Sequence, residues 1–355
     1  MKKSRYYDGI SKELKSYFKI LSPVFPEWLH EYIDTDAMRR IGHISMDCGC
    51  DYTNLFERHP WHSNLDHSVG VALIIWNFTK DKKATLAGLF HDIATPVFKH
   101  CIDFMNGDSE TQESTEEKTY EMIKNSTEIM NLLDRDNIKI EEVADYKIYP
   151  IADNDSPHLA ADRFEYNFGC GLIIHPFWTL EKLKKCYDDV TILTNEYGEK
   201  ELGFKTIEVA EEYIEVTSKL WPIWISPEDR ITMQFLADMC LTLQRLDELT
   251  IDELYELKES EVIDRIKNSS DESVREAFLK FESATKCYIS DEQISDRYCI
   301  NVTSKSRYLN PLVKTTDGVV RIYDISPQAK ENIDNYLNLP KSGFVYFDFD
   351  FIPKK

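Results

Sequence analysis

The chain has 355 residues, which is long enough to bury a sizeable core as one large domain or two unequal ones. It carries 42 Lys and Arg residues against 63 Asp and Glu residues, a formal net charge of −21. This charge argues against duplex nucleic acid as the main partner, because phosphate backbones need a concentrated basic surface. A small phosphorylated ligand remains compatible with it, since a metal ion and a few cations can reverse the local field.

The distribution of apolar residues and cysteines points to the cytoplasm. No apolar run reaches the ~20 residues that a membrane span needs, and the N-terminal residues lack the apolar stretch of a secretory signal. Eight cysteines are scattered without a CxxC pair, which is typical of reduced thiols packed as small hydrophobic residues. We therefore expect a cytoplasmic protein with no membrane partner.

Helical periodicity dominates the chain up to about residue 285. The expected helices cover residues 65–78, 85–93, 116–133, 159–168, 205–221 and 228–247, with the 159–168 helix closed by Gly169 and Gly171. An acidic helical stretch follows over residues 250–285. Two strand-like runs come last, at 319–325 and 344–351. In the second run phenylalanines alternate with aspartates, and we expect the aromatic face to pack on its own chain, with a subunit interface as the alternative.

Among nine histidines, one group calls for a chemical explanation. His91 and Asp92 are adjacent at the end of an apolar helix, His67 lies on an earlier core helix, and Asp162 opens a later one. A buried imidazole and a buried carboxylate are costly unless they are paired or bound to a metal. Two imidazoles and two carboxylates suit a divalent ion with open coordination positions. On spacing alone, a structural ion pair between His91 and Asp92 is an equal alternative.

Three blocks of the sequence resemble a known family. They are residues 64–71 (NLDHSVGV), 88–93 (GLFHDI) and 162–166 (DRFEY). In order and spacing they resemble the HD superfamily of metal-dependent phosphohydrolases, and most of all its deoxynucleoside triphosphate triphosphohydrolase branch. The resemblance covers roughly residues 30–240. It implies an all-α bundle with one metal ion at its centre, held by His67, His91, Asp92 and Asp162.

The resemblance, together with the shift in composition after about residue 250, implies an organisation for the whole chain. We expect a mainly α fold, an HD-domain helical bundle with a small α+β C-terminal extension. Its parts would be an N-terminal helical segment (1–32), the HD phosphohydrolase-like domain (33–248) and an acidic helical and short β-strand region (249–355). One divalent ion per chain (Mn, Fe, Co, Ni or Zn) is expected, and a homo-oligomer is an open alternative to a monomer.

Several positions depart from that branch. Thr95 and Thr115 stand where it has histidines, Cys170 where it has an aspartate, and Asn64 where it has an arginine that would face substrate phosphates. In the segment that would grip a triphosphate tail, near residues 222–236, Arg230 is the one cation. A triphosphate typically needs several Arg or Lys contacts. The departures therefore favour a smaller anion, such as a nucleoside monophosphate, another phosphomonoester, or a cyclic or diester substrate.

The remaining candidate residues lie around the three blocks. His100 is the first candidate for protonating the leaving oxygen or steering the phosphate, with a solvated loop histidine as the alternative. Glu116 and Glu117 are further catalytic candidates, although capping of a helix start explains them as well. The substrate-binding candidates are Asn64, Lys99, Arg163 and Tyr166, and for Tyr166 core packing is an equal alternative.

Three functions follow, in this order. The first is a metal-dependent phosphohydrolase that acts on a nucleotide or related small phosphate ester through a metal-activated water. The second is a non-catalytic or regulatory nucleotide-binding protein that keeps the metal site. The third is a two-iron oxygenase, which ranks last because only His100 and His158 lie between the His-Asp pair and Asp162 as extra ligands.

Overall fold

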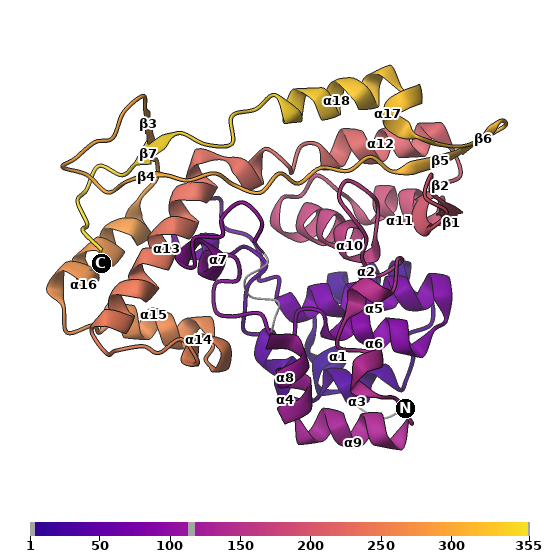
Figure 1. Cartoon of the computed structure of the whole chain (residues 1–355), viewed down its shortest axis with the longest axis horizontal. Helices are drawn as coiled ribbons and strands as arrows, with labels where there is room; N and C mark the ends of the chain where they lie inside the picture. Colours follow the sequence, from indigo (N-terminus) through magenta and orange to yellow (C-terminus); the bar gives the residue numbers. More distant parts are fainter. Residues whose placement is uncertain (1–3, 113–117, 354–355) are drawn as a thin grey trace.

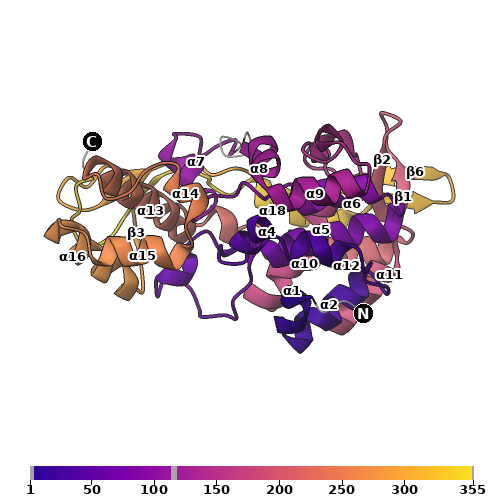
Figure 2. The same cartoon turned by 90° about the horizontal axis from the view of Figure 1, so that it is seen from below.

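Two hydrophobic cores lie side by side in the computed structural model, which describes residues 4–112 and 118–353 (Figure 1). Helices form most of both, and two small sheets are added by later parts of the chain. The predicted class, mainly α with a small α+β extension near the C-terminus, is confirmed. The chain begins in one lobe and ends in the other (Figure 2).

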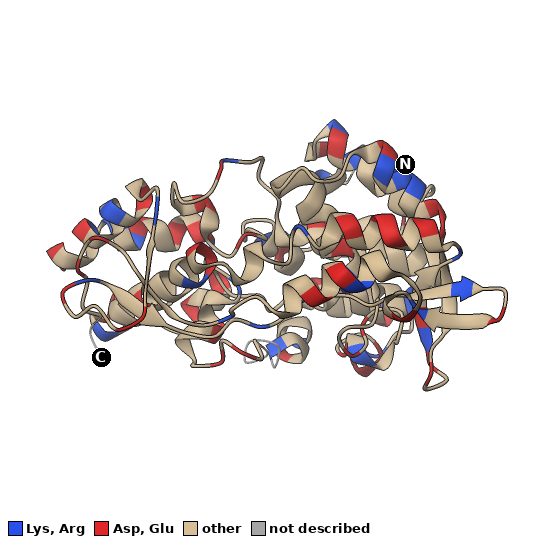
Figure 3. Ribbon diagram, turned by 90° about the horizontal axis from the view of Figure 1, so that it is seen from above, with Lys and Arg blue, Asp and Glu red and all other residues tan. Residues whose placement is uncertain are grey.

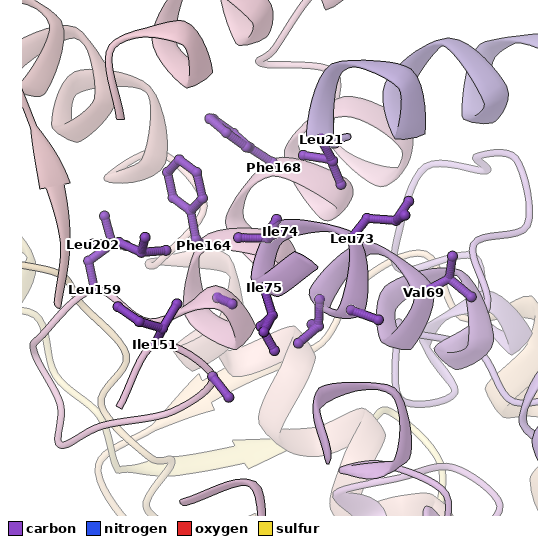
Figure 4. Packing of buried hydrophobic residues seen from close by; sticks show 14 of the residues in the cluster. Leu21, Val69, Leu73, Ile74, Ile75, Ile151, Leu159, Phe164, Phe168 and Leu202 are labelled. Carbon is purple, nitrogen blue, oxygen red and sulfur yellow. The ribbon is translucent and has the colours of Figure 1, made fainter. Parts of the chain in front are cut away.

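The first core is organised around α5 (Asn64–Thr79), which is buried on every side from Asn64 to Ile75. A helix that is apolar all round belongs at the centre of a helical body. Its start is fixed by a capping box between Ser63 and Asp66. Side chains of α5 meet Phe164 and Phe168 of α10 in this core (Figure 4). The helices of this body are α1 (Arg5–Gly9), α2 (Lys12–Leu21), α3 (Leu29–Ile33), α4 (Asp36–Ile41), α6 (Lys82–Phe90), α8 (Thr119–Asn125), α9 (Thr127–Arg135), α10 (Ala161–Gly169), α11 (Leu180–Asp188) and α12 (Ile207–Thr217).

The second core surrounds α13 (Pro227–Arg245), the longest helix of the described chain. It packs with α7 (Cys101–Met105), α14 (Glu253–Glu256), α15 (Glu259–Lys267) and α16 (Glu272–Ser283). A three-stranded antiparallel sheet covers it, in the order β3 (Tyr288–Ser290), β7 (Phe344–Tyr346), β4 (Cys299–Asn301). Phe347, Phe349 and Phe351 are buried here and pack around Phe235 of α13. The aromatic face is thus covered within its own chain, as expected.

A four-stranded sheet lies at the edge of the first core, in the order β1 (Val190–Thr194), β2 (Lys200–Phe204), β5 (Leu312–Thr315), β6 (Gly318–Arg321). After β6, α17 (Ile322–Ile325) and α18 (Pro327–Leu337) return onto α12. Residues beyond 249 therefore contribute to both cores. The division into 1–32, 33–248 and 249–355 stays a prediction, and these contacts tie its last part to the helical domain.

Several sequence-based boundaries were wrong. The helix expected over 116–133 is two helices in its described part, because Ser126 ends α8 and caps α9 through its side chain. The helix expected to close at Gly169 runs through that residue into a π-helical turn, Cys170–Ile174. The strand expected over 319–325 ends at Arg321, and α17 begins at the next residue, Ile322. The last strand is limited to Phe344–Tyr346.

The β1–β2 hairpin had no counterpart among the predicted elements, and strands of three to five residues give too few alternations to be recognised. Single helical turns at Cys50–Tyr52, Ile140–Glu142, Tyr146–Ile148 and Ile223–Ile225 complete the fold. All eight cysteines are free thiols. Within the described residues, no helix is both long enough and apolar enough to cross a membrane. Acidic residues are spread over most helices (Figure 3).

Candidate metal centre

The four predicted metal ligands converge at one point of the first core. His67 projects from the buried helix α5, His91 and Asp92 follow the end of α6, and Asp162 is the second residue of α10. The Nε2 atoms of the two histidines lie 3.2 Å apart. Asp162 Oδ1 lies 3.0 Å from His67 Nε2 and 3.5 Å from His91 Nε2. Helix α5 packs against both α6 and α10, and this packing brings the four side chains together.

These separations fit one shared ion. With metal–ligand bonds of about 2.1 Å, neighbouring ligand atoms lie about 3.0 Å apart around an octahedral ion and about 3.4 Å apart around a tetrahedral one. His67, His91 and Asp162 match that range. Asp92 Oδ2 lies 3.6 Å from His91 Nε2 and 4.0 Å from His67 Nε2, close enough to complete the set.

The hydrogen bonds of the two imidazoles favour a metal site over a simple ion pair. His91 Nδ1 lies 2.8 Å from the carbonyl oxygen of Gly88, and His67 Nδ1 lies 2.6 Å from Glu165 Oε2. A carbonyl or carboxylate oxygen can only accept, so both Nδ1 atoms carry the hydrogen. In the neutral rings, both Nε2 lone pairs then face each other across 3.2 Å. A metal ion between them, or a proton on one ring, relieves that repulsion, and oxygen acceptors at Nδ1 are typical of metal-bound histidines.

The electrostatics of the cluster also favour a cation. Burial raises the pKa of Asp162, but the hydrogen bonds from His67 and His91 outweigh it and hold that pKa well below its usual range. Burial lowers the pKa of His67, yet Asp162 and Glu165 outweigh it and raise the pKa to about 9. These pKa shifts show that the cluster stabilises positive charge, which protons supply when no metal ion is bound.

Sequence reasoning assigned no role to Glu165, which orients His67. Glu165 is fully buried, and its other oxygen accepts a hydrogen bond of 2.9 Å from the Tyr17 hydroxyl. The available signal was its position three residues after Asp162, which places both carboxylates on one face of α10. Gly70 of α5 makes room for it, because a Cβ at Gly70 would lie only 2.5 Å from Glu165 Oε1.

Gly70→Ala should weaken metal binding although Gly70 is not a ligand. The added Cβ would push Glu165 away from His67, and Glu165 has no room to retreat because it is buried. We expect a 10- to 100-fold loss of metal affinity, roughly what loss of the hydrogen-bond partner of a metal ligand costs. The added Cβ should also lower the free energy of unfolding, because overpacking costs about 1–3 kcal/mol and the gain in helix propensity is only about 1 kcal/mol.

Metal titration measures the loss of metal affinity, and urea unfolding measures the loss of stability. Gly9→Ala, where a Cβ meets nothing within 4 Å, is the control, and an equal response of both variants would contradict the argument.

A cavity of about 590 Å³ opens beside the cluster, where the two cores meet. His67, His91, Asp92 and Asp162 form part of its wall. Among the described residues, five cationic side chains line the cavity together with five carboxyl groups; the cations are Lys99, Lys147, Arg163, Lys305 and Arg307. A divalent ion would add positive charge to this set, which suits an anionic ligand.

The comparisons with known proteins agree with this centre. A model of the HD domain family matches residues 64–152, which include His67, His91 and Asp92. Residues 64–152 form an HD domain. An uncharacterized protein of Bacillus subtilis (strain 168), YdhJ, is 21% identical over 269 residues, covering 75% of this chain and 78% of its own length. The triphosphohydrolase branch stays a prediction.

Two solved structures share the fold over nearly the whole chain. A hypothetical protein from Aquifex aeolicus has a TM-score of 0.61 at 16% identity and covers 91% of this chain and 92% of its own. A phosphohydrolase from Bacteroides thetaiotaomicron VPI-5482 has a TM-score of 0.62 at 13% identity and covers 91% of this chain and 96% of its own. The likeness extends well beyond the HD domain at 64–152, so these folds include counterparts of the C-terminal region.

Lys99 and Asn64 lie together next to the HD centre. Lys99 is nearly buried and lines the cavity, with its Nζ 3.4 Å from Asp92 Oδ2 and hydrogen-bonded to Asn64 Oδ1. Phe98 and Lys99 both have positive φ angles, of 63° and 49°. Two consecutive non-glycine residues in the left-handed region are uncommon and concentrate at functional sites. Asn64 lies behind Lys99, where it also donates to Thr95 Oγ1, and it is absent from the described cavity wall. Its contact with substrate stays a prediction.

Arg163 and Tyr166 line the cavity from α10. Arg163 is already engaged, donating to the His158 carbonyl and to Asn154 and pairing with Asp153 Oδ1 at 3.0 Å. The Tyr166 ring meets Trp224 edge to face at 5.3 Å. Both positions allow contact with a ligand, and their substrate-binding roles stay predictions.

Of the three catalytic candidates, His100 alone belongs to the part of the chain that the structure describes. His100 lines the cavity and is held from both sides, by Asp103 and by Arg307. Glu116 and Glu117 lie outside the described residues, as does Thr115.

Sequence reasoning missed most of the cavity's cations. Arg230, the one cation of the segment near 222–236, donates to the Val302 and Gly343 carbonyls and is absent from the described wall. Lys147, Lys305 and Arg307 take its place there. The expectation of a site poor in cations was therefore wrong, because two of these residues lie more than 200 positions after the HD pair. No local motif marks them.

Asp229 is the other missed residue. It lines the cavity from the first turn of α13, is nearly buried, and its Oδ2 has no hydrogen-bond partner in the described chain. Burial, reinforced by nearby Asp47, raises the pKa of Asp229 well above its usual range. Burial therefore favours the protonated, uncharged form of Asp229, which lessens the negative charge of the cavity.

Proposed function

We propose that this HD protein is a metal-dependent phosphohydrolase that acts on a nucleotide or a related small phosphate ester. The proposal rests on one observation. A cavity that five described cationic side chains line also contains the point where His67, His91, Asp92 and Asp162 converge. The HD domain and the fold shared with a protein described as a phosphohydrolase support the same reaction class.

The four predicted metal ligands indicate how the reaction would proceed. A divalent ion bound there supplies an ionised water as nucleophile and polarises a phosphoryl oxygen. The side chains of this chain do the rest. Glu165 keeps the His67 lone pair directed at the ion site, and the Gly88 carbonyl does the same for His91. Lys99 Nζ, 3.4 Å from Asp92 Oδ2, would place a positive charge beside a phosphate bound at that ion.

The size and lining of the cavity support a nucleotide-sized ligand. A volume of about 590 Å³ lies within the range of about 300–1,000 Å³ typical of small-molecule sites. Besides its cations, the wall carries Met46, Tyr166, Trp224 and Met233. Such a surface suits an uncharged ring system, while the charged part of the ligand faces the cations. A homo-oligomer and a cytoplasmic location stay predictions from the sequence alone.

The proposal is tested with the purified full-length protein. Elemental analysis should find about one divalent ion per chain. A phosphate-release screen over nucleoside mono-, di- and triphosphates and p-nitrophenyl phosphate, with added Mn²⁺, Co²⁺ or Ni²⁺, should give multiple turnovers on at least one ester. Absence of metal together with absence of release would overturn the proposal. Thermal stabilisation by nucleotides without any release would instead favour the regulatory alternative.

A further inference from the structure

A segment far from the HD domain in sequence forms one wall of the cavity. Residues 302–311, the strap, connect β4 to β5 and run along both lobes (Figure 1). The Asn310 backbone N–H donates to the Pro157 carbonyl at 2.9 Å, and the Ser304 N–H donates to the Lys341 carbonyl at 3.1 Å. Between these anchors the strap presents Lys305, Ser306 and Arg307 to the cavity.

Arg307 is fixed in place more firmly than a surface arginine. Its backbone N–H donates to the hydroxyl of the buried Tyr336 at 2.8 Å. Its Nη2 donates to Gln112 Oε1 at 2.5 Å and approaches His100 Nε2 at 3.2 Å. Among the described residues, Nε and Nη1 have no hydrogen-bond partner. A preorganised guanidinium with unused donors is therefore held at the wall of a metal cavity.

The contact with Arg307 defines the state of His100. A guanidinium has no acceptor and stays charged at all working pH values, so His100 Nε2 must accept. On the other side, His100 Nδ1 lies 2.9 Å from the carboxylate of the buried Asp103 and carries the hydrogen. Burial lowers the pKa of His100, and Arg307 lowers it further against the opposing effect of Asp103. In this arrangement the ring is neutral and has no proton at Nε2 to give to a leaving group.

Two consecutive residues connect Arg307 to the metal centre. Lys99 Nζ contacts the ligand Asp92, and the next residue, His100, contacts Arg307. Neighbouring Cα atoms are only about 3.8 Å apart, so the two cations reach adjacent parts of one cavity. A phosphate bound at the metal would therefore find a lysine and an arginine nearby. The planar guanidinium fork matches the oxygens of a phosphate.

We propose that Arg307 binds the phosphate of the substrate from the C-terminal strap, and that His100 is a positioning residue that aims the guanidinium. This inference rests on the proposed function, since it assigns residues to the same phosphate site. It supplies a cation to the phosphate site in place of Arg230, which is absent from the described cavity wall. It also replaces the predicted role of His100 as general acid.

The first test measures phosphate binding directly. Inorganic phosphate should raise the melting temperature of the metal-loaded protein and inhibit hydrolysis of p-nitrophenyl phosphate competitively. Arg307→Ala should weaken both effects about tenfold or more, and Arg307→Lys should restore part of the loss, because charge returns without the fork. Arg297→Ala is the matched control, since Arg297 lies on the C-terminal region outside the cavity wall and contacts Asp296. Unchanged phosphate affinity in Arg307→Ala would overturn the proposal.

The second test separates positioning from acid catalysis at His100. If His100 acts through Arg307, His100→Ala should raise KM more than it lowers kcat, and it should have almost no further effect in the Arg307→Ala background. A general acid would instead lower kcat for alkyl phosphates while sparing p-nitrophenyl phosphate, whose leaving group needs no proton. That pattern, or additive losses in the double variant, would overturn the positioning role.

The two proposals fail in different ways. If the wild-type protein releases phosphate from no ester, the proposed function fails, but the melting-temperature titration with inorganic phosphate still decides on Arg307. If the wild-type protein is active and Arg307→Ala binds inorganic phosphate as the wild type does, only the inference about the strap fails.

Discussion

Replacing Asp162 by alanine should remove the metal ion and abolish phosphate release. Asp162 Oδ1 lies within 3.5 Å of both imidazole Nε2 atoms, so it is the ligand that closes the set. Without it, His67 and His91 retain opposed lone pairs and only the more distant Asp92 as an anionic partner. We expect metal content to fall from about one ion per chain to almost none at micromolar protein, and phosphate release to fall by at least about a thousandfold.

Elemental analysis after gel filtration measures the metal content of Asp162→Ala, and circular dichroism verifies its fold. Asp155→Ala is the matched control, because Asp155 is an exposed carboxylate on the same cavity wall and is absent from the described ligand group. It should keep its ion. Full metal content in Asp162→Ala, or equal losses in both variants, would contradict the assignment of the centre.

The helical part of the fold could be predicted because its signal is local. The pattern of α5 is continuous over 16 residues, and its expected range, 65–78, differs from the observed one by a single residue at each end. The prediction failed where the deciding interaction is short or tertiary. Ser126 caps a new helix inside an apparently continuous pattern. The strand pair of β2 and β5 joins residues more than 100 positions apart, and no periodicity encodes such a contact.

The same contrast between local signals and tertiary contacts applies to the candidate site. The metal ligands lie in three blocks with a recognisable order, and residue type alone restricts what buried His and Asp can do. The phosphate side has no such pattern. Arg307 is one arginine in the irregular segment 302–311, and its meaning depends on Tyr336, Gln112 and His100, which hold it at the cavity. The role of Glu165 likewise becomes visible only when α5 and α10 are packed together.

A second large effect should appear in the pH dependence of stability, through Glu259. This residue begins α15, is fully buried, and connects the C-terminal helices to the segment that follows α4. Its Oε1 accepts from the Ser45 N–H at 3.0 Å and its Oε2 from the Tyr52 hydroxyl at 3.1 Å. Burial raises the pKa of Glu259 from 4.5 to about 8, although the hydrogen bond from Ser45 opposes the shift. The folded protein therefore keeps a proton that the unfolded chain releases.

The sign of the effect follows from that difference. Between pH 4.5 and about 8 the folded state binds the extra proton, so raising the pH through this window favours unfolding. Each pH unit costs at most about 1.4 kcal/mol, and the window as a whole about 3–5 kcal/mol. Glu259→Gln has no titrating proton at this position. Its free energy of unfolding should thus fall less than that of the wild type as the pH rises.

Urea unfolding at pH 5.0, 6.5 and 8.0, with metal-loaded wild type and Glu259→Gln side by side, measures this difference. Comparing the two proteins cancels the contributions of the other titrating groups, which both share. The exposed Glu256→Gln is the control and should follow the wild type at every pH. Parallel curves for wild type and Glu259→Gln would mean that the folded protein does not hold Glu259 in its protonated form. A stability gap that widens with pH would instead place this buried carboxyl among the contacts that join the second core to the segment carrying Met46 and Cys48 on the cavity wall.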